Sequence, residues 1–479
     1  VGSIVLSCRS GFGQGFDWFD DRFAPSDYES FQPVVERNAA RVVESATGWL
    51  ETWQAAGRAK PFFLFVHFFD PHMQYNPPPP FDQEYRFSPY AGEIAYVDYC
   101  LGQLVDYLKA KDLYDGLLIV LAGDHGEGLG DHKEHTHGLF LYEEAVRIPF
   151  IVKLPKQEGV KTGIRSGQSV SLEDVFPTLA DLCGLGPAGT NGISLAPWLL
   201  EDAEPQPRQV ALETMYPLTY NWSPLYALRD STWKYVHAPL QEIYHLSDDP
   251  GERANLVDSA TAPLREMQDA LENRLIALAQ SRTNVASHLI TTDRMEVLHA
   301  LGYAAGGVVP GTLGPNTPLP DPKTKINIYL HNDQGLAAMA KGYTEESIEI
   351  FQNAISEDPN NPTSYLNLGL AYSQQERWDE AIRYTQKALE LAPQTNIIHL
   401  QLARLFILAG ELPKARQLLE VIIKDNPESA EAHYQLGKVA LEEKRFDEAA
   451  RHFEDVQRWM PDFPGIEEDI QSAHAGKEK

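Results

Sequence analysis

The 479-residue chain has few cysteines, few cations and no long apolar segment. Its three cysteines are too few, and odd in number, to form the disulfide framework of a small secreted domain. No apolar run reaches the about 20 residues that a membrane-spanning helix needs. The 40 Lys and Arg residues stand against 68 Asp and Glu, which gives a net charge of −28 at pH 7. We therefore expect neither a nucleic-acid-binding surface nor an anionic-membrane surface.

The most informative segment lies between Leu118 and Pro155. It opens with the apolar run Leu117–Leu121, whose Leu, Ile and Val side chains predict a parallel strand buried on both faces. Asp124 and His125 follow at the strand end, where open α/β sheets bind ligands. A carboxylate beside an imidazole suits a divalent cation such as Zn, Mn or Ca. We therefore predict that Asp124 and His125 are metal ligands.

Three further histidines, His132, His135 and His137, lie within six residues of one another just downstream. They are candidates for additional metal or substrate contacts. The alternative for each of them is a solvated loop in which the imidazole caps backbone groups.

A second apolar run, Pro61–Asp70, reads PFFLFVHFFD and predicts another buried strand. It ends in Asp70, which could contact a metal or substrate, and His72 follows two residues later. Such a strand would deliver His72 to the same sheet edge as Asp124. The alternative is that His72 only caps the loop.

These motifs in combination resemble the sulfatase branch of the alkaline phosphatase superfamily. Its members carry a D-H-G or D-N-G metal pair, then LGxH, a Lys or His before Gly, YEE and RxP. The matching residues are Asp124-His125-Gly126, Leu129-Gly130-Asp131-His132, His137-Gly138, Tyr142-Glu143-Glu144 and Arg147-Ile148-Pro149. The resemblance implies an α/β fold with an alkaline-phosphatase-like sheet and hydrolysis of sulfate esters.

Within that resemblance, His72 and His137 contact the transferred group, and Asp124 and His125 hold the metal, which is Ca in a sulfatase. The family's nucleophile stands in C-x-P-x-R, with Cys converted to formylglycine, or in a Ser or Thr variant. No C-x-P-x-R occurs in these 479 residues, and no Ser or Thr variant lies in the part that precedes Asp124, where the family carries it. We therefore expect the chain to begin inside the catalytic domain, with the nucleophile and any formylglycine in a preceding part. The resemblance also implies a periplasmic or other extracytoplasmic location.

One residue keeps a second activity open. Many sulfatases carry Lys where this chain has His137, and an imidazole can bind a second metal. With His132 and His135 nearby, a two-metal phosphodiesterase or phosphatase of the same superfamily, using Zn or Mn, is the alternative. The substrate is accordingly a sulfated or phosphorylated small molecule or glycan.

Short runs with strand character follow from Gln209 to His245 and predict a small antiparallel sheet. The tail Ile243–Leu256 resembles the close of the sulfatase C-terminal subdomain, and its charged residues are expected to serve turns and caps. Apolar positions between Leu264 and Leu278 predict a helix. Another helix is expected at Met295–Tyr303.

The C-terminal part repeats with a period of 34 residues. Pro359, Pro393, Pro427 and Pro461 are equally spaced, as are Ala381, Ala415 and Ala449. This helix-turn-helix period is similar to that of the all-α tetratricopeptide solenoid. Such a solenoid predicts a groove for an unknown protein or peptide, and the alternative is a stabilising or dimerising appendage.

The predicted organisation is a catalytic domain at 1–256, helical segments at 257–303, a Gly- and Pro-rich linker at 304–322, four repeats at 328–463 and a capping tail at 464–479. A non-catalytic interaction protein with a vestigial half-site is the alternative from a different class of function.

Overall fold

The computed structural model describes residues 1–3, 6, 12–23, 36–58, 60–73, 75–157, 162–186, 189–201, 206–281, 319–460, 463 and 465–477. They form two compact units, residues 1–123 with 149–165, and residues 124–148 with 166–479. No helix in these ranges has the length and apolar character needed to cross a membrane. The predicted helix at Met295–Tyr303 and residues 304–318 of the predicted linker lie outside the described residues.

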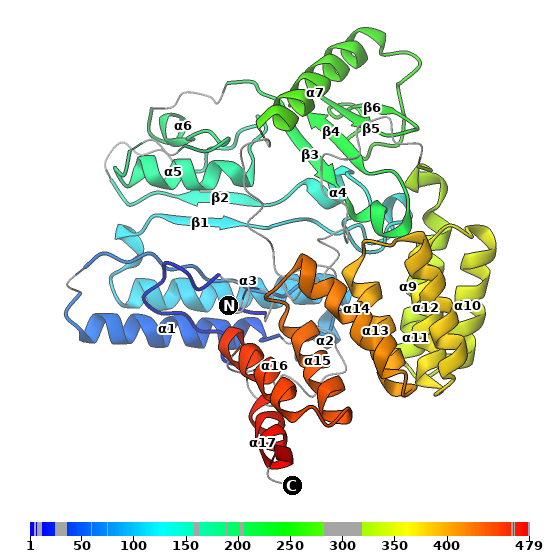
Figure 1. Ribbon diagram of the computed structural model, residues 1–479. Helices are drawn as coiled ribbons and strands as arrows, with labels where there is room; N and C mark the ends of the chain where they lie inside the picture. The colour runs from blue at the N-terminus through cyan, green and yellow to red at the C-terminus, as the bar shows by residue number, and fades with distance from the viewer. Residues whose placement is uncertain are drawn as a thin grey trace. The chain divides into compact units, whose positions relative to one another are not determined.

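Two long helices form the framework of the first unit. Helix α1 (Ala39–Ala55) begins at Asn38, whose side chain accepts a hydrogen bond from the Arg41 N–H at 3.2 Å. Helix α3 (Pro89–Ala110) lies beside it (Figure 1). Their apolar faces meet, because Leu50 of α1 and Leu108 of α3 belong to one buried cluster.

Among the described residues, the sheet of this unit consists of two strands that are distant in sequence. Strand β1 (Ile119–Ala122) pairs antiparallel with β2 (Phe150–Lys153), Ile119 opposite Lys153 and Ala122 opposite Phe150. The prediction of a parallel strand at Leu117–Leu121 is therefore wrong in direction. The run is also only partly buried rather than covered on both faces. A continuous run of apolar residues indicates that a strand is buried, but it does not indicate whether the partner strand is parallel or antiparallel.

The segment Pro61–Asp70 is extended, but among the described residues it joins no strand ladder. The predicted strand is therefore not formed there. Phe62 and Leu64 pack on the α1–α3 cluster, whereas Phe63 and Phe65 on the alternate face are 66% and 50% exposed. The period of two expected of a strand is kept, and only one face is covered.

The second unit contains the predicted antiparallel sheet. Its strands follow in the order β3 (Val210–Thr214), β4 (Leu225–Arg229), β5 (Trp233–His237) and β6 (Glu242–His245). Helix α7 (Thr261–Ser281) covers the helix predicted at Leu264–Leu278. Its Met267 and Leu271 are buried against Tyr235 and other residues of the sheet. The small sheet and its helix are thus confirmed.

Nine short helical elements lie between the longer helices and strands in the described residues. They are α2 (Phe81–Glu84), η4 (Tyr114–Gly116), η5 (Asp131–Lys133), α4 (Glu143–Val146), η6 (Leu172–Asp174), α5 (Val175–Leu182), α6 (Ala196–Glu201), η7 (Tyr216–Tyr220) and η9 (Pro322–Thr324).

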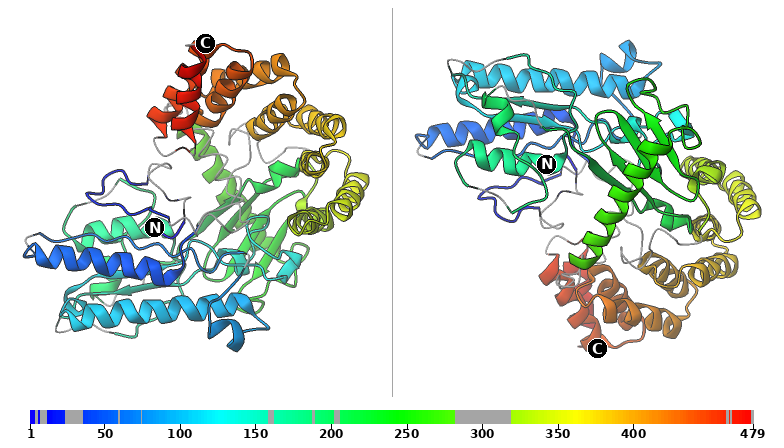
Figure 2. Two further views of the ribbon diagram at one scale, coloured as in Figure 1. Left: turned by 90° about the horizontal axis from the view of Figure 1, so that it is seen from below. Right: turned by 90° about the horizontal axis from the view of Figure 1, so that it is seen from above.

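The repeats form four helix pairs and one final helix. The pairs are α9 (Ile326–Ala340) and α10 (Thr344–Glu357), α11 (Pro362–Gln374) and α12 (Trp378–Leu391), α13 (Asn396–Leu408) and α14 (Leu412–Asp425), and α15 (Ala430–Glu442) and α16 (Phe446–Trp459), followed by α17 (Ile466–Lys477). They follow one another in a curved row, coloured yellow to red in Figure 2. Glycines permit the close crossings: a Cβ on Gly437 would lie 2.4 Å from the Phe453 ring.

Candidate functional site

The loop that follows β1 is folded tightly back on itself. The N–H of Gly126 donates to the Ala145 carbonyl at 2.7 Å, and the N–H of Gly128 donates to the Thr136 carbonyl at 2.7 Å. A Cβ on Gly126 would lie 2.1 Å from the backbone carbonyl oxygen of Glu144, and a Cβ on Gly128 would lie 2.3 Å from the backbone carbonyl oxygen of Glu134. Only glycine allows these approaches, so the glycines hold the two arms of the loop together.

Three of the predicted site residues converge on this loop. The Asp124 Oδ2 lies 3.7 Å from the His125 ring nitrogen Nε2. The backbone N–H of His125 donates to Asp124 Oδ1 at 2.9 Å. The His125 ring stacks on the His137 ring with centroids 3.7 Å apart. His137 Nδ1 contacts the Oε1 of Glu127 at 3.2 Å, and the Glu127 side chain is only 5% exposed. The structure therefore brings Asp124, His125 and His137 together, with Glu127 orienting the last.

The donor set suits part of a cation site. Asp124 offers a carboxylate that is 72% exposed, and the His125 Nε2 faces it. The other His125 nitrogen, Nδ1, lies 2.8 Å from the Gly126 carbonyl oxygen, which orients the ring. One hard oxygen and one imidazole nitrogen fit a divalent ion. No group of three or more metal-binding side chains occurs in the described part of the chain. Asp124 and His125 are therefore candidate donors, and their role as metal ligands stays a prediction.

His132 is engaged elsewhere. Its Nδ1 lies 2.5 Å from Glu144 Oε1, its Nε2 lies 3.1 Å from the Glu252 carbonyl oxygen, and its ring stacks on Tyr142. Burial lowers the pKa of His132, but its bonds to Glu144 and Glu252 outweigh this and raise the pKa. With both nitrogens bound to protein, His132 fastens the loop to the small sheet rather than facing Asp124.

His135 is exposed on the same loop and lies near helix α9. Burial raises the pKa of Asp333 on that helix, and the charge of His135 acts against this effect. The neighbouring Glu134 is 2% exposed, and its carboxylate accepts the N–H groups of Leu139 at 2.7 Å and Phe140 at 3.2 Å. Burial raises the pKa of Glu134 to about 8. The sequence analysis did not single out Glu134, because nothing in the sequence distinguishes it from the rest of the 68 acidic residues.

The Tyr142-Glu143-Glu144 motif anchors the loop to the sheet. The Tyr142 hydroxyl donates to Glu242 Oε1 at 3.0 Å. Glu143 accepts two bonds from Arg229, at 3.0 and 3.1 Å.

A buried lysine completes this anchor. Lys234 Nζ is fully buried, 2.9 Å from Glu252 Oε1 and 3.4 Å from Glu143 Oε1. Glu252 of the Ile243–Leu256 tail is 1% exposed and accepts the backbone N–H of Glu143 at the start of α4 at 2.5 Å, so it serves as a cap, as predicted, in addition to its ion pair with Lys234. Lys234 and its two partners, Glu252 and Glu143, are not neighbours in the sequence, so no local sequence pattern predicts these contacts.

Asp70 and His72 lie in the first unit, on the loop that follows the extended segment. The His72 N–H donates to Glu93 Oε2 at 3.2 Å, and its ring stacks on Phe69. Burial raises the pKa of Asp70 to about 6 and those of Glu36 and Glu93 to about 7. The roles predicted for Asp70 and His72 stay predictions, because these two residues and the loop of Asp124 belong to different units.

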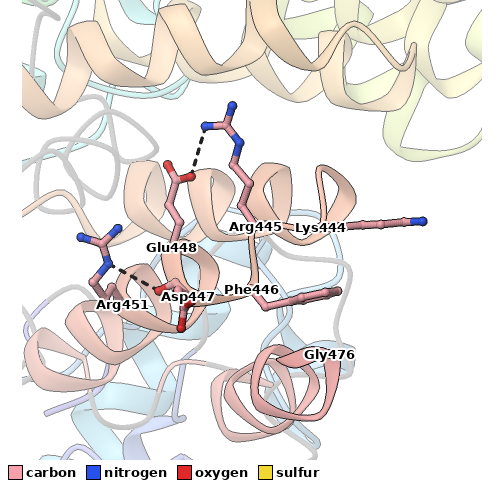
Figure 3. A pocket seen from close by; sticks show the side chains of 7 residues that line it. All are labelled: Lys444, Arg445, Phe446, Asp447, Glu448, Arg451 and Gly476. Atoms are coloured by element: carbon pink, nitrogen blue, oxygen red, sulfur yellow. Dashed lines mark hydrogen bonds and ion pairs between the residues drawn. The ribbon is translucent and has the colours of Figure 1, made fainter. Parts of the chain in front are cut away.

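A hollow lies between helix α16 and Gly476 of α17 (Figure 3). Its lining holds three cations, Lys444, Arg445 and Arg451, and two acids, Asp447 and Glu448. Arg445 lies 3.4 Å from Glu448 Oε2, and Arg451 donates to the Asp447 carbonyl at 3.4 Å. Since both signs of charge line this hollow, it has no marked preference for an anion such as sulfate.

Comparison with known families agrees with the two-part organisation. A model described as "Sulfatase" matches residues 4–185, one described as "N-sulphoglucosamine sulphohydrolase, C-terminal" matches residues 130–281, and one described as "Cytochrome c-type biogenesis protein H TPR domain" matches residues 337–463.

Similar proteins include a choline-sulfatase of Rhizobium meliloti, 33% identical over 36% of this chain and 34% of the relative. The multifunctional alkaline phosphatase superfamily protein PehA of Trinickia caryophylli is 34% identical over 41% of this chain and 42% of that protein. The chain thus spans about two fifths or less of the length of these relatives.

Among solved structures, a putative sulfatase from Bacteroides fragilis aligns with a TM-score of 0.45 and 18% identity over 50% of this chain and 59% of that one. The family matches agree with the motifs at Asp124 to Pro149 and with the 34-residue period. The chain therefore contains a sulfatase domain of the alkaline phosphatase superfamily at residues 4–185, followed by a C-terminal tetratricopeptide repeat domain.

Proposed function

We propose that the Asp124 loop is the half-site of a metal-dependent sulfate-ester hydrolase. The observation that carries the proposal is the convergence of Asp124, His125 and His137 on a glycine-tightened loop, with the His125 and His137 rings 3.7 Å apart. Asp124 and His125 would hold one divalent cation, with Ca as the expected ion. Such a cation supplies charge stabilisation at an oxygen of the ester.

His137 would contact the transferred group or protonate the leaving alcohol. Its Nδ1 faces the buried Glu127 carboxylate at 3.2 Å, which favours a proton on Nδ1 and fixes the ring orientation. An imidazole oriented in this way can exchange a proton at Nε2, which is typically worth about 10²- to 10⁴-fold in rate. The sequence contains no C-x-P-x-R motif, so the proposal covers cation binding and group transfer but no nucleophile.

The proposed substrate is a sulfate ester of a small molecule or glycan. One relative is named a choline-sulfatase and another a Delta 4,5-hexuronate-2-O-sulfatase, which supports this class of substrate. The net charge of −28 disfavours densely sulfated polymers, because like charges repel. The repeat domain is proposed to dock a protein or peptide.

A phosphodiesterase activity is the second candidate. His137 stands where many sulfatases have Lys, and an imidazole at this place could bind a second cation beside the one proposed for Asp124 and His125. PehA, described as multifunctional within the same superfamily, is among the relatives. Zn or Mn would then be preferred over Ca.

Cation binding by this chain tests the proposal without the need for turnover. Isothermal titration with Ca²⁺, Zn²⁺ and Mn²⁺ should give one specific site that Asp124→Asn weakens by about 10-fold or more, since a charged ligand is lost. Asp248→Asn is the matched control, because Asp248 is 83% exposed and pairs only with His245 in the described contacts. Equal affinities for wild type and Asp124→Asn would contradict the proposal. A clear preference for Zn or Mn would favour the phosphodiesterase.

A further inference from the structure

The first tetratricopeptide repeat touches the histidine-rich loop directly. The Tyr329 hydroxyl of helix α9 lies 2.7 Å from the Thr136 Oγ1. Tyr329 is 6% exposed, so this hydrogen bond is shielded from water. Thr136 stands between His135 and His137 in the sequence. The bond therefore joins the repeat domain to the residue next to the proposed proton-transfer group.

The contact belongs to a broad packed interface. Ile326, Ile328 and Tyr329 of α9 share one buried cluster with Leu139 and Phe140 of the loop. The same cluster contains Tyr220 and Trp222, whose rings are stacked 4.6 Å apart. Helix α9 thus packs on the loop itself and on the segment between β3 and β4.

Polar bonds fix the register of this interface. The Trp222 Nε1–H donates to Asp358 Oδ2 at 2.9 Å, and the Thr363 hydroxyl donates to the Thr219 carbonyl at 2.7 Å. At the start of the repeats, Asp321 Oδ2 accepts the Leu240 N–H at 2.8 Å. Buried directional bonds of this kind hold one arrangement of the two surfaces, because a shifted arrangement would leave polar groups unpaired.

Thr136 occupies a central place in the loop. Its carbonyl accepts the Gly128 N–H at 2.7 Å, which closes the glycine turn, while its hydroxyl meets Tyr329. The adjacent His137 is held by Glu127 on the opposite arm of that turn. A shift of Thr136 would therefore change the distance between His137 and both Glu127 and His125.

We propose that helix α9 is a positioning element of the active site, in which Tyr329 fixes Thr136 and through it the orientation of the His137 ring. Asp333, one helical turn after Tyr329, adds a negative charge near His135. The repeat domain then has a second task besides docking a partner. The consequence for turnover rests on the proposed function, whereas the effect on the His137 ring does not.

The test removes one hydroxyl at a time. Tyr329→Phe keeps the ring and its packing, and the ¹⁵N- and ¹³C-labelled histidine side chains are followed by NMR at one fixed pH in the 479-residue chain. We expect the His137 ring signals to shift and the contacts between the His137 and His125 rings to weaken, because the bond that holds Thr136 is lost. Thr136→Val should reproduce this shift, Thr136→Ser should restore wild-type behaviour, and the double variant should add little to either single one.

Tyr235→Phe is the matched control, because the buried Tyr235 hydroxyl lies 3.0 Å from the His237 Nδ1 in the same unit. It should move the His237 signals and leave those of His137 unchanged. The proposal is overturned if Tyr329→Phe and Thr136→Val both fold and leave the His137 ring signals at their wild-type positions, or if Tyr235→Phe shifts these signals equally.

Turnover separates the two proposals. If the gene-encoded protein hydrolyses a sulfate ester, Tyr329→Phe should lower kcat by about 3- to 10-fold with little change in KM, as loss of one positioning bond predicts. If that protein hydrolyses no ester while the His137 signals still respond to Tyr329→Phe, the proposed function fails and the positioning role stands. Loss of folding in Tyr329→Phe transfers the test to Thr136→Val, and unchanged His137 ring signals in that variant would then overturn the proposal alone.

Discussion

The repeat domain and the first unit bury their aromatic side chains in different ways. In the repeats, Phe351 and Phe453 are fully buried against glycines of the preceding helix, only 16 residues away in each case. In the first unit, Phe63 and Phe65 remain 66% and 50% exposed on an extended segment. A solenoid gains its core from neighbours in sequence, whereas a sheet needs strands from distant parts of a chain. We therefore expect the repeat domain to resist local change, and the sheets of the first unit and of β3–β6 to depend on a few long-range contacts.

Lys234→Met should have the largest effect on stability. Lys234 is fully buried and contacts Glu252 and Glu143, so the change leaves the buried Glu252 carboxylate without its cation, whereas Glu143 keeps its two bonds from Arg229. We expect a loss of about 3 to 5 kcal/mol in the free energy of unfolding. The counterpart in the repeats is Lys438→Met, whose lysine is 37% exposed beside Asp469 and should cost about 1 kcal/mol or less. Urea unfolding of both variants measures the difference, and equal losses would remove the contrast between the regions.

Two glycine substitutions sharpen the comparison in the opposite direction. Gly437→Ala places a Cβ 2.4 Å from the Phe453 ring and should cost about 1 to 3 kcal/mol, since the packed crossing must open. Gly48→Ala in the middle of α1 meets no atom within 4 Å and should stabilise the first unit by up to about 1 kcal/mol. Thermal unfolding checks both signs. Destabilisation by Gly48→Ala would show that the surface of α1 is less open than the structure indicates.

The two regions should also respond to pH with opposite signs. In the repeats, burial and the nearby His433 lower the pKa of His452 to about 4. The unfolded chain then binds more protons, so this contribution to stability is lost as pH falls from about 6.5 to 4. In the first unit, burial raises the pKa of Glu93 to about 7. The folded state binds more protons there, so stability is lost as pH rises from about 4.5 to 7.

Hydrogen exchange resolved by region at pH 5 and pH 7 measures these slopes, each worth about 1 to 2 kcal/mol. His452→Gln should flatten the slope in the repeats, and Glu93→Gln should flatten the slope in the first unit. Slopes that keep their wild-type values in these variants would assign the pH dependence to other groups.

The repeat boundaries were predictable because the pattern is local. Helices α11, α13 and α15 begin at residues 362, 396 and 430, which keeps the 34-residue period of the sequence. The antiparallel sheet predicted between Gln209 and His245 also agrees with the structure, since turn residues separate its strands. Local periodicity and turn chemistry determine such elements.

Part of the candidate site was predictable, but its supports were not. Asp124, His125 and His137 were proposed from motif spacing and strand-end position, and the structure brings the three side chains together, while their roles stay predictions. Glu127 and Lys234 were missed, because their burial depends on partners that only the fold supplies. The contact of Tyr329 with Thr136 joins residues 193 positions apart, and no periodic signal connects them. Long-range polar contacts of this kind need three-dimensional structure.

Hydrolysis of 4-nitrophenyl sulfate by the gene-encoded protein, with bis(4-nitrophenyl) phosphate in parallel, tests the central claim most directly. Each rate is measured for wild type, Asp124→Asn and the control Asp248→Asn, with and without added Ca²⁺. The account predicts cation-dependent cleavage of the sulfate ester, a loss of about 10²-fold or more in kcat/KM for Asp124→Asn, and no change for Asp248→Asn. Sulfate-ester cleavage that Asp124→Asn leaves at the wild-type rate would contradict it.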